Sequence, residues 1–174
     1  MKIFKLILFT AFISLTISCS KDDDNPAPEN NGNIIGVWKG TTVNYTGSTT
    51  TTAQGQSITA DYVGEAYDVD YTLTFTENPK KVVSDGSYSI ELTTTVNGQS
   101  TTQNVENLEL LSSGDWSING NTLSITVDNE TDDATIVELT NNNLVLNVVE
   151  TETNTGSGFT VTSTTDVTLS FTKQ

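Results

Sequence analysis

Apolar and polar residues alternate with a period of two along most of the chain after Gly36. Successive side chains of a β-strand point to opposite faces of its sheet, so this period predicts strands that bury one face and expose the other. Threonine fills many of the polar positions, and its branched β-carbon favours strand over helix. The pattern is unbroken over residues 67–76, and it returns at 88–96, 123–127, 144–148 and 167–171.

Turn sequences separate the alternating segments. Asn97-Gly98 and Asn119-Gly120 supply the positive φ angles that tight hairpins require, and Asp85-Gly86 and Asn141-Asn142 are further turn signals. Hairpins between successive strands produce an antiparallel meander. The sequence therefore predicts an all-β domain, a closed or nearly closed meander β-barrel of about eight to ten strands.

Three polar segments are longer than a barrel core requires: residues 44–59, 93–103 and 150–158. They are rich in Thr, Asn, Gln and Glu and contain few large apolar residues. We expect the first two to project from one end of the barrel, and the third is a candidate of the same kind. Such loops frequently carry binding sites, although variable filler is the alternative interpretation.

Apolar side chains on the alternating segments are expected to face the barrel interior, where they either fill the space or leave room for one ligand. Trp38 and Trp116 are expected in the core, since an indole buries a large area and needs one partner for its N–H group. The other residues expected to face inward are Leu73, Phe75, Tyr88, Ile90, Leu92, Leu108, Leu110, Ile118, Leu123, Ile125, Leu144, Leu146, Leu169 and Phe171.

The N-terminus has the pattern of an export signal. Lys2 and Lys5 precede an apolar run at 6–17, which is about a dozen residues long and shorter than the roughly 20 that a membrane-spanning helix needs. Cys19 follows it and is the only cysteine, so no internal disulfide can form. We therefore expect residues 1–18 to be a cleaved signal peptide.

Residues 15–19 resemble the cleavage region of bacterial lipoproteins, which implies that Cys19 carries the lipid and anchors the protein in a membrane. An ordinary secreted protein is the alternative. The next residues resemble the acidic export signal of Bacteroidetes-type lipoproteins, which implies the outer face of the outer membrane; a solvated tether is the alternative. Residues 19–33 are expected to be a disordered tether, and 34–174 the folded domain. The acidic signal consists of Ser20, Lys21, Asp22, Asp23 and Asp24.

Composition excludes several functions. The formal charge is −15 and arginine is absent, so the chain is expected to repel nucleic acids. Histidine is also absent, which removes Ser-His-Asp and Cys-His catalysis and the usual ligands of zinc. We expect no enzyme activity, no cofactor and no metal site. Asp68 with Asp70, and the acidic turn at 128–133, are expected to be solvated, with an acid–base pair or calcium as the alternatives.

The folded part begins with a Gly-x-Trp pattern at Gly36-Val37-Trp38, and further characteristic segments follow at 73–78, 87–90, 114–125, 138–146 and 169–173. In these features it resembles the lipocalin-like domains of bacterial lipoproteins. The resemblance implies a lipocalin-like barrel in which Trp38 closes the floor. Lys173 is the candidate for the basic residue that often caps this tryptophan from the last strand.

These observations lead to three hypotheses. The leading one is a surface-exposed, lipid-anchored, lipocalin-like barrel that binds a ligand without catalysis, such as a small hydrophobic molecule in its interior. The alternative is a filled barrel that acts as an envelope module and contacts a protein or a glycan through its polar hairpins. A hydrolase based on two carboxylates is the third, and it requires both acids in one cleft.

Overall fold

The computed structural model describes residues 30–174. The expected signal peptide at 1–18, Cys19 and the acidic run at 20–24 lie outside the described residues. Nine strands and no helix make up the described part, which accordingly contains no apolar helix of membrane-spanning length. The strands are β1 (Gly36–Ala53), β2 (Gln56–Glu77), β3 (Lys80–Val96), β4 (Gln99–Leu108), β5 (Gly114–Asn119), β6 (Thr122–Val127), β7 (Glu130–Leu139), β8 (Asn143–Gly156) and β9 (Phe159–Lys173).

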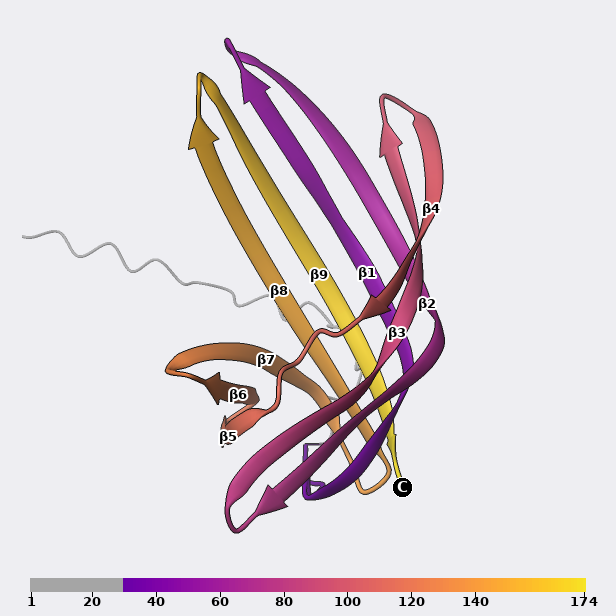
Figure 1. Cartoon of the computed structure of the whole chain (residues 1–174), viewed down its shortest axis with the longest axis vertical. Coiled ribbons are helices and arrows are strands. Elements are labelled where there is room, and N and C mark those ends of the chain that lie inside the picture. Colours follow the sequence, from indigo (N-terminus) through magenta and orange to yellow (C-terminus); the bar gives the residue numbers. More distant parts are fainter. Residues whose placement is uncertain (1–29) are drawn as a thin grey trace, which may run out of the picture.

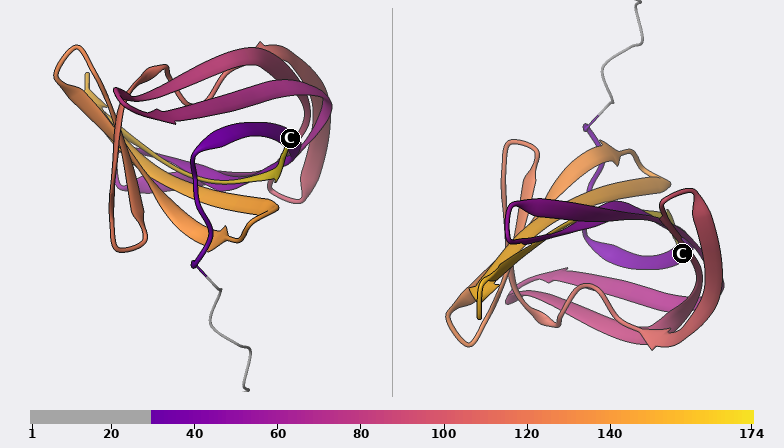
Figure 2. Two further views of the ribbon diagram at one scale, coloured as in Figure 1. Left: turned by 90° about the horizontal axis from the view of Figure 1, so that it is seen from below. Right: turned by 90° about the horizontal axis from the view of Figure 1, so that it is seen from above.

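The strands form one antiparallel sheet that closes on itself. Their order is β2-β1-β9-β8-β7-β6-β5-β3-β4, and the additional pairing of β2 with β3 completes the ring. Figure 2 shows this ring from both of its ends. The predicted all-β meander barrel of about eight to ten strands is therefore confirmed.

Unequal strand lengths divide the molecule into two parts. β5 and β6 have only 6 residues each, whereas β1, β2 and β3 have 18, 22 and 17. The hairpins β1–β2, β3–β4 and β8–β9 consequently extend together beyond the ring, with their tips at the top of Figure 1. The name closed end is used for the part of the molecule in which β5, β6 and β7 close the ring between β8 and β3. The concave face of the six extended strands, in the order β8-β9-β1-β2-β3-β4, is the trough.

Side chains fill the closed end. Trp38, Tyr71 and Leu123 are fully buried in one continuous apolar cluster, and burial of this kind stabilises the fold by roughly 25 cal/mol per Å² of apolar surface. Of the residues expected to face inward, Leu92, Leu108 and Leu110 are partly buried against this cluster. The fully confirmed ones are Leu73, Phe75, Tyr88, Ile90, Leu123, Ile125, Leu144, Leu146, Leu169 and Phe171.

The expectation for Ile118 is wrong, because its side chain is 36% exposed. Its strand, β5, pairs with β3 only at Asp115 and Gly114. Beyond these two residues β5 pairs only with β6, so no strand on its other side covers the side chain of Ile118.

The turn expected at Asp85-Gly86 is also wrong. Gly86 lies inside β3, opposite Tyr71, with φ of 81°, and a β-carbon there would stand 1.8 Å from the Asp70 carbonyl oxygen. A β-bulge in β2 between Tyr67 and Asp70 faces the same place, and it breaks the alternation expected at 67–76. The turns expected at 97–98 and 141–142 are confirmed. The turn expected at 119–120 lies one residue later, at 120–121, because Asn119 still pairs with Thr122 in the hairpin.

The three long polar segments are hairpin extensions. Residues 44–59, 93–103 and 150–158 form the outer parts of β1–β2, β3–β4 and β8–β9, and their strands pair to the tips. All three point the same way (Figure 1), as expected for the first two. These segments are paired strands, so their alternation places every second side chain in the trough.

The described chain begins at the closed end. Asn30 bridges to Leu139, and the Gly32 N–H donates to the Leu139 carbonyl at 2.9 Å. Residues 30–33, expected to belong to the tether, therefore contact the turn between β7 and β8. This turn lies opposite the hairpin tips (Figure 1).

Candidate functional site

Two tyrosines form the floor of the trough. Tyr45 on β1 and Tyr88 on β3 share a hydrogen bond between their hydroxyl groups, and Tyr88 also packs edge-on against Tyr71 with 5.8 Å between ring centroids. Tyr88 is 1% exposed, whereas Tyr45 is only partly buried. Burial raises the pKa of both hydroxyls, and the nearby charge of Glu150 raises that of Tyr45 further. The pair separates the packed core from the open trough.

Tyr71 holds the connection between β4 and β5 in place. Its hydroxyl donates to the Leu111 carbonyl at 3.0 Å and accepts from the Leu111 N–H at 3.1 Å. The Ser84 hydroxyl donates to it as well, at 3.0 Å. Since Tyr71 and Leu111 are both buried, one side chain satisfies two backbone groups that water cannot reach.

A cavity of about 260 Å³ lies where the barrel wall opens, beside this connection. Its lining includes apolar side chains at Leu110, Leu111 and Val148, and acidic ones at Asp132, Asp133 and Glu150. β7 pairs with β8 no further than Asn147, so β8 has a free edge above that residue. The cavity is thus continuous with the side of the trough at which Glu150 stands.

The most unusual feature of the trough is the position of Tyr62. Tyr62 on β2, Gly47 on β1 and Thr165 on β9 are direct neighbours across three strands, and Glu150 on β8 is the next residue of the row. The Tyr62 hydroxyl reaches over Gly47 to bond with the Thr165 hydroxyl and to donate to the Thr164 carbonyl at 3.0 Å. The phenol ring therefore lies along the sheet.

The Tyr62 ring can lie across β1 because Gly47 has no side chain. A β-carbon at Gly47 would stand 2.5 Å from Cζ and from the hydroxyl oxygen of Tyr62. Any other residue at Gly47 would displace the ring. One face of the Tyr62 ring thus rests on the Gly47 backbone, and its side chain remains partly exposed to the trough.

Hydroxyl groups lie next to Tyr62 on the concave face, and apolar side chains such as Ile58 and Phe159 follow toward the tips. Thr49 and Ser163 are neighbours in the next row toward the tips, and their hydroxyls lie 3.0 Å apart. Glu152 on β8 follows Ser163 in that row, as Glu150 follows Thr165 in the row of Tyr62. Both glutamates are exposed. The trough around Tyr62 is thus a hydroxyl-bearing surface with two carboxylates along one side.

Positive charge gathers at the other end of the molecule. Lys39, Lys80, Lys81 and Lys173 are the lysines of residues 30–174, and all lie on strand segments of the closed end. Lys39 and Lys81 face Asp70 and Asp115 at 3.9 and 2.7 Å. The trough of the described part therefore carries negative charge without a lysine to offset it.

The tryptophans and Gly36 lie at the closed end. Trp38 donates its indole N–H to the Ile34 carbonyl at 2.6 Å, and the Lys173 ammonium lies 5.0 Å from the ring centroid. Lys173 also donates to the Asn33 carbonyl at 2.7 Å. Gly36 has φ of 128°, and a β-carbon there would stand 3.0 Å from the Lys173 side chain. Lys173 thus occupies the capping position considered for it in the sequence.

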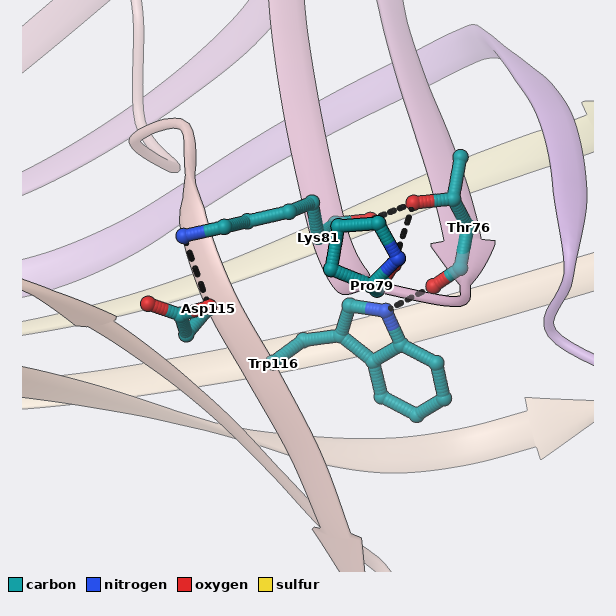
Figure 3. Close-up of polar contacts among 5 residues, drawn as sticks. All are labelled: Thr76, Pro79, Lys81, Asp115 and Trp116. Atoms are coloured by element: carbon teal, nitrogen blue, oxygen red, sulfur yellow. Dashed lines mark hydrogen bonds and ion pairs between the residues drawn. The ribbon is translucent and has the colours of Figure 1, made fainter.

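Trp116 belongs to the seam that closes the ring between β3 and β5. Figure 3 shows its indole N–H donating to the Thr76 carbonyl, at 2.8 Å, next to the ion pair of Lys81 and Asp115. The Thr76 hydroxyl in turn donates to the Pro79 carbonyl at 2.8 Å, within the turn between β2 and β3. Trp116 therefore fastens β5 to this turn.

The acidic residues considered for catalysis or metal binding do not converge. Asp68 and Asp70 are exposed, and Asp133 of the turn at 128–133 accepts a hydrogen bond from Ser124 at 2.6 Å. Within residues 30–174 no charged side chain is buried, and no three acids gather in a way that suits a metal ion. Asp132, Asp133 and Glu150 line the cavity beside the connection between β4 and β5, but all three side chains are exposed, and Asp68 and Asp70 are not part of that lining.

Tyr62, Gly47 and Glu150 were missed as a group in the sequence. The sequence pattern predicts projecting loops at 44–59 and 150–158, and it assigns Tyr62 to no face. Alternation alone places Tyr45, Gly47 and Thr49 on one face of a strand. The signal for the site is a glycine directly opposite a tyrosine, and it requires the register between β1 and β2.

A family model described as a lipocalin-like domain matches residues 34–146. No curated protein and no solved structure matches the chain.

Proposed function

The chain belongs to the lipocalin-like domain family, and from this premise we propose that it is a non-catalytic binding protein whose ligand lies in the trough. We further propose that lipid on Cys19 holds it on the outer face of the outer membrane. A barrel that binds a ligand is consistent with the lipocalin-like fold. The location of the ligand, the anchor and the absence of catalysis are the specific parts of the proposal.

One observation carries the choice of the trough. The closed end is filled by a continuous cluster of buried side chains, whereas the concave face of the extended strands is uncovered. Tyr, Thr, Ser and Glu line it around Tyr62, and the apolar side chains of Ile58 and Phe159 are exposed on it near the tips. Of the two binding hypotheses, this favours the filled barrel with an external interaction surface over a hydrophobic molecule in a closed interior. Binding sites are generally concave, with a few convergent polar groups, and the trough has both properties.

The direction of the chain supports the anchored arrangement. The described chain begins against the turn between β7 and β8 at the closed end. A lipid on Cys19 would hold this end toward the membrane and leave the hairpin tips and the trough pointing away from it. That orientation suits a module that captures molecules from outside the cell.

Native mass spectrometry of the full-length protein, purified gently from the cells that produce it, tests the proposal. We expect a reproducible additional mass that leaves on denaturation. Thr49→Trp fills the trough and is expected to abolish the additional mass, whereas Ser48→Trp alters the outer face of the same strand and is expected to retain it. A protein without any retained mass, or a mass that both variants retain equally, would contradict the proposal.

A further inference from the structure

The row of Tyr62, Gly47, Thr165 and Glu150 has the chemistry of a sugar-binding site. We propose that the trough binds a carbohydrate, neutral or bearing an amino group, with one sugar ring stacked on Tyr62. This inference rests on the proposed function and names the ligand class of the same surface.

The platform is the first element of the site. Tyr62 lies over Gly47, and its hydroxyl is held by Thr165 and by the Thr164 carbonyl on the far side of β1. The ring is therefore fixed before any ligand arrives. Tyr62 takes part in none of the aromatic pairs of residues 30–174, so no ring covers its face toward the trough. The C–H face of a sugar ring is apolar and weakly positive, which suits the negative face of a phenol.

Hydrogen-bonding groups flank the platform on the same face, together with the apolar side chains of Ala60 and Val96. Thr94 on β3 is the direct neighbour of Tyr62 on one side, and Thr49 with Ser163 forms the next row toward the tips. Neighbouring strands lie about 4.8 Å apart, so these hydroxyls stand at the distance where the rim of a stacked sugar ring would carry its own hydroxyls. A sugar thus finds both an apolar platform and polar partners.

Charge selects among carbohydrates. Glu150 ends the row of Tyr62, and Glu152 ends the next row, while the lysines of the described chain lie at the closed end. Carboxylates accept hydrogen bonds from sugar hydroxyls and attract an ammonium group. They repel sulfated or uronic acid sugars, so the trough is expected to disfavour anionic glycans.

The alternative is a purely structural role, in which Tyr62 clamps β2, β1 and β9 together. Two variants separate the roles. Tyr62→Phe loses the hydroxyl bonds and retains the platform, whereas Tyr62→Ala loses both. Tyr67→Ala, on the same strand but outside the trough, is the matched control.

The test measures binding of cellohexaose, maltohexaose, mannohexaose and chitosan hexamer to the full-length protein by calorimetry, with heparin and polygalacturonate as anionic probes. We expect one neutral or amino sugar to bind, Tyr62→Ala to weaken it at least about tenfold, and Tyr62→Phe and Tyr67→Ala to weaken it less than about threefold. Glu150→Gln is expected to weaken chitosan binding and to relieve the exclusion of the anionic probes.

Binding that survives Tyr62→Ala, or that prefers heparin, would overturn the inference. If no sugar binds while native mass spectrometry finds a retained mass of another class, the carbohydrate inference fails and the proposed function stands. If no sugar binds and no mass is retained, both fail. Thermal unfolding of each variant distinguishes a lost site from a lost fold.

Discussion

The Tyr71 hydroxyl is bonded to both backbone groups of Leu111 in a region without water access. Tyr71→Phe leaves the Leu111 N–H and carbonyl without partners, and each unsatisfied buried group costs about 1–3 kcal/mol. We expect this variant to lower the free energy of unfolding by about 2 kcal/mol, measured by urea denaturation. Tyr67→Phe is the control, since its hydroxyl makes none of the hydrogen bonds found in residues 30–174. Equal stability of the two variants would contradict the assigned role of Tyr71.

Tyr88 connects stability to pH. Burial raises the pKa of its hydroxyl above the ordinary value of 10.0, so the folded protein holds this proton more tightly than the unfolded chain does. The contribution is therefore complete below pH 10 and is lost as the pH rises further, by about 1.4 kcal/mol per pH unit. Tyr88→Phe removes this loss.

We expect the difference in unfolding free energy between the wild type and Tyr88→Phe to shrink by about 1 kcal/mol between pH 8 and pH 11. Leu92→Ala destabilises the same strand without changing a titrating group, so its difference from the wild type is expected to stay constant. A difference for Tyr88→Phe that does not change over this range would contradict the raised pKa.

At the scale of elements, the seam between β3 and β5 is the narrowest pairing of the ring, with two pairs of residues. Trp116→Phe removes the hydrogen bond to the Thr76 carbonyl, and we expect it to lower the unfolding free energy by about 1–2 kcal/mol. Hydrogen exchange of the amides of β5 is expected to accelerate more than that of β8 and β9.

Lys81→Ala is the matched change at the same seam. The ion pair of Lys81 with Asp115 is largely exposed, so its loss is expected to cost less than about 1 kcal/mol. A larger loss of β5 protection in Lys81→Ala than in Trp116→Phe would show that the ion pair, and not the indole, fastens this strand.

The strands were predictable because each needs only a local period of two and a turn signal, as in the hairpin at Asn97-Gly98. Gly86 was misread because a glycine with positive φ serves a turn and a close backbone approach equally well, and only the bulge on the neighbouring strand distinguishes them. Ile118 was misread because its burial depends on whether β5 has a second neighbour. Both outcomes depend on which strands pair, and the sequence of a single strand does not contain that information.

At the scale of the molecule, the candidate site depends on register in the same way. The three polar segments were predictable from composition, and so was the common direction of the first two, 44–59 and 93–103. The row that joins Tyr62 to Glu150 crosses four strands whose residues are up to about a hundred positions apart. The site therefore emerges only once the long hairpins are paired to their tips.

Membrane attachment is a prediction about the whole chain. Cys19→Ser removes the thiol that lipidation requires, and we expect the protein to move from the membrane fraction to the soluble fraction in cell fractionation. Replacement of Asp22, Asp23 and Asp24 by Asn is expected to leave the protein in the membrane but to hide it from protease added outside the cells. Unchanged fractionation of Cys19→Ser would contradict the lipid anchor.

The central claim is that ligand binds in the trough and not among the side chains of the closed end. Hydrogen–deuterium exchange of the protein as purified from its own cells, before and after the ligand is removed by unfolding and refolding, measures this most directly. We predict that removal of the ligand increases exchange in peptides covering residues 45–64 and 161–167 and leaves β5, β6 and β7 unchanged. Altered exchange confined to β5–β7 and the buried core, with the trough unaffected, would contradict the claim.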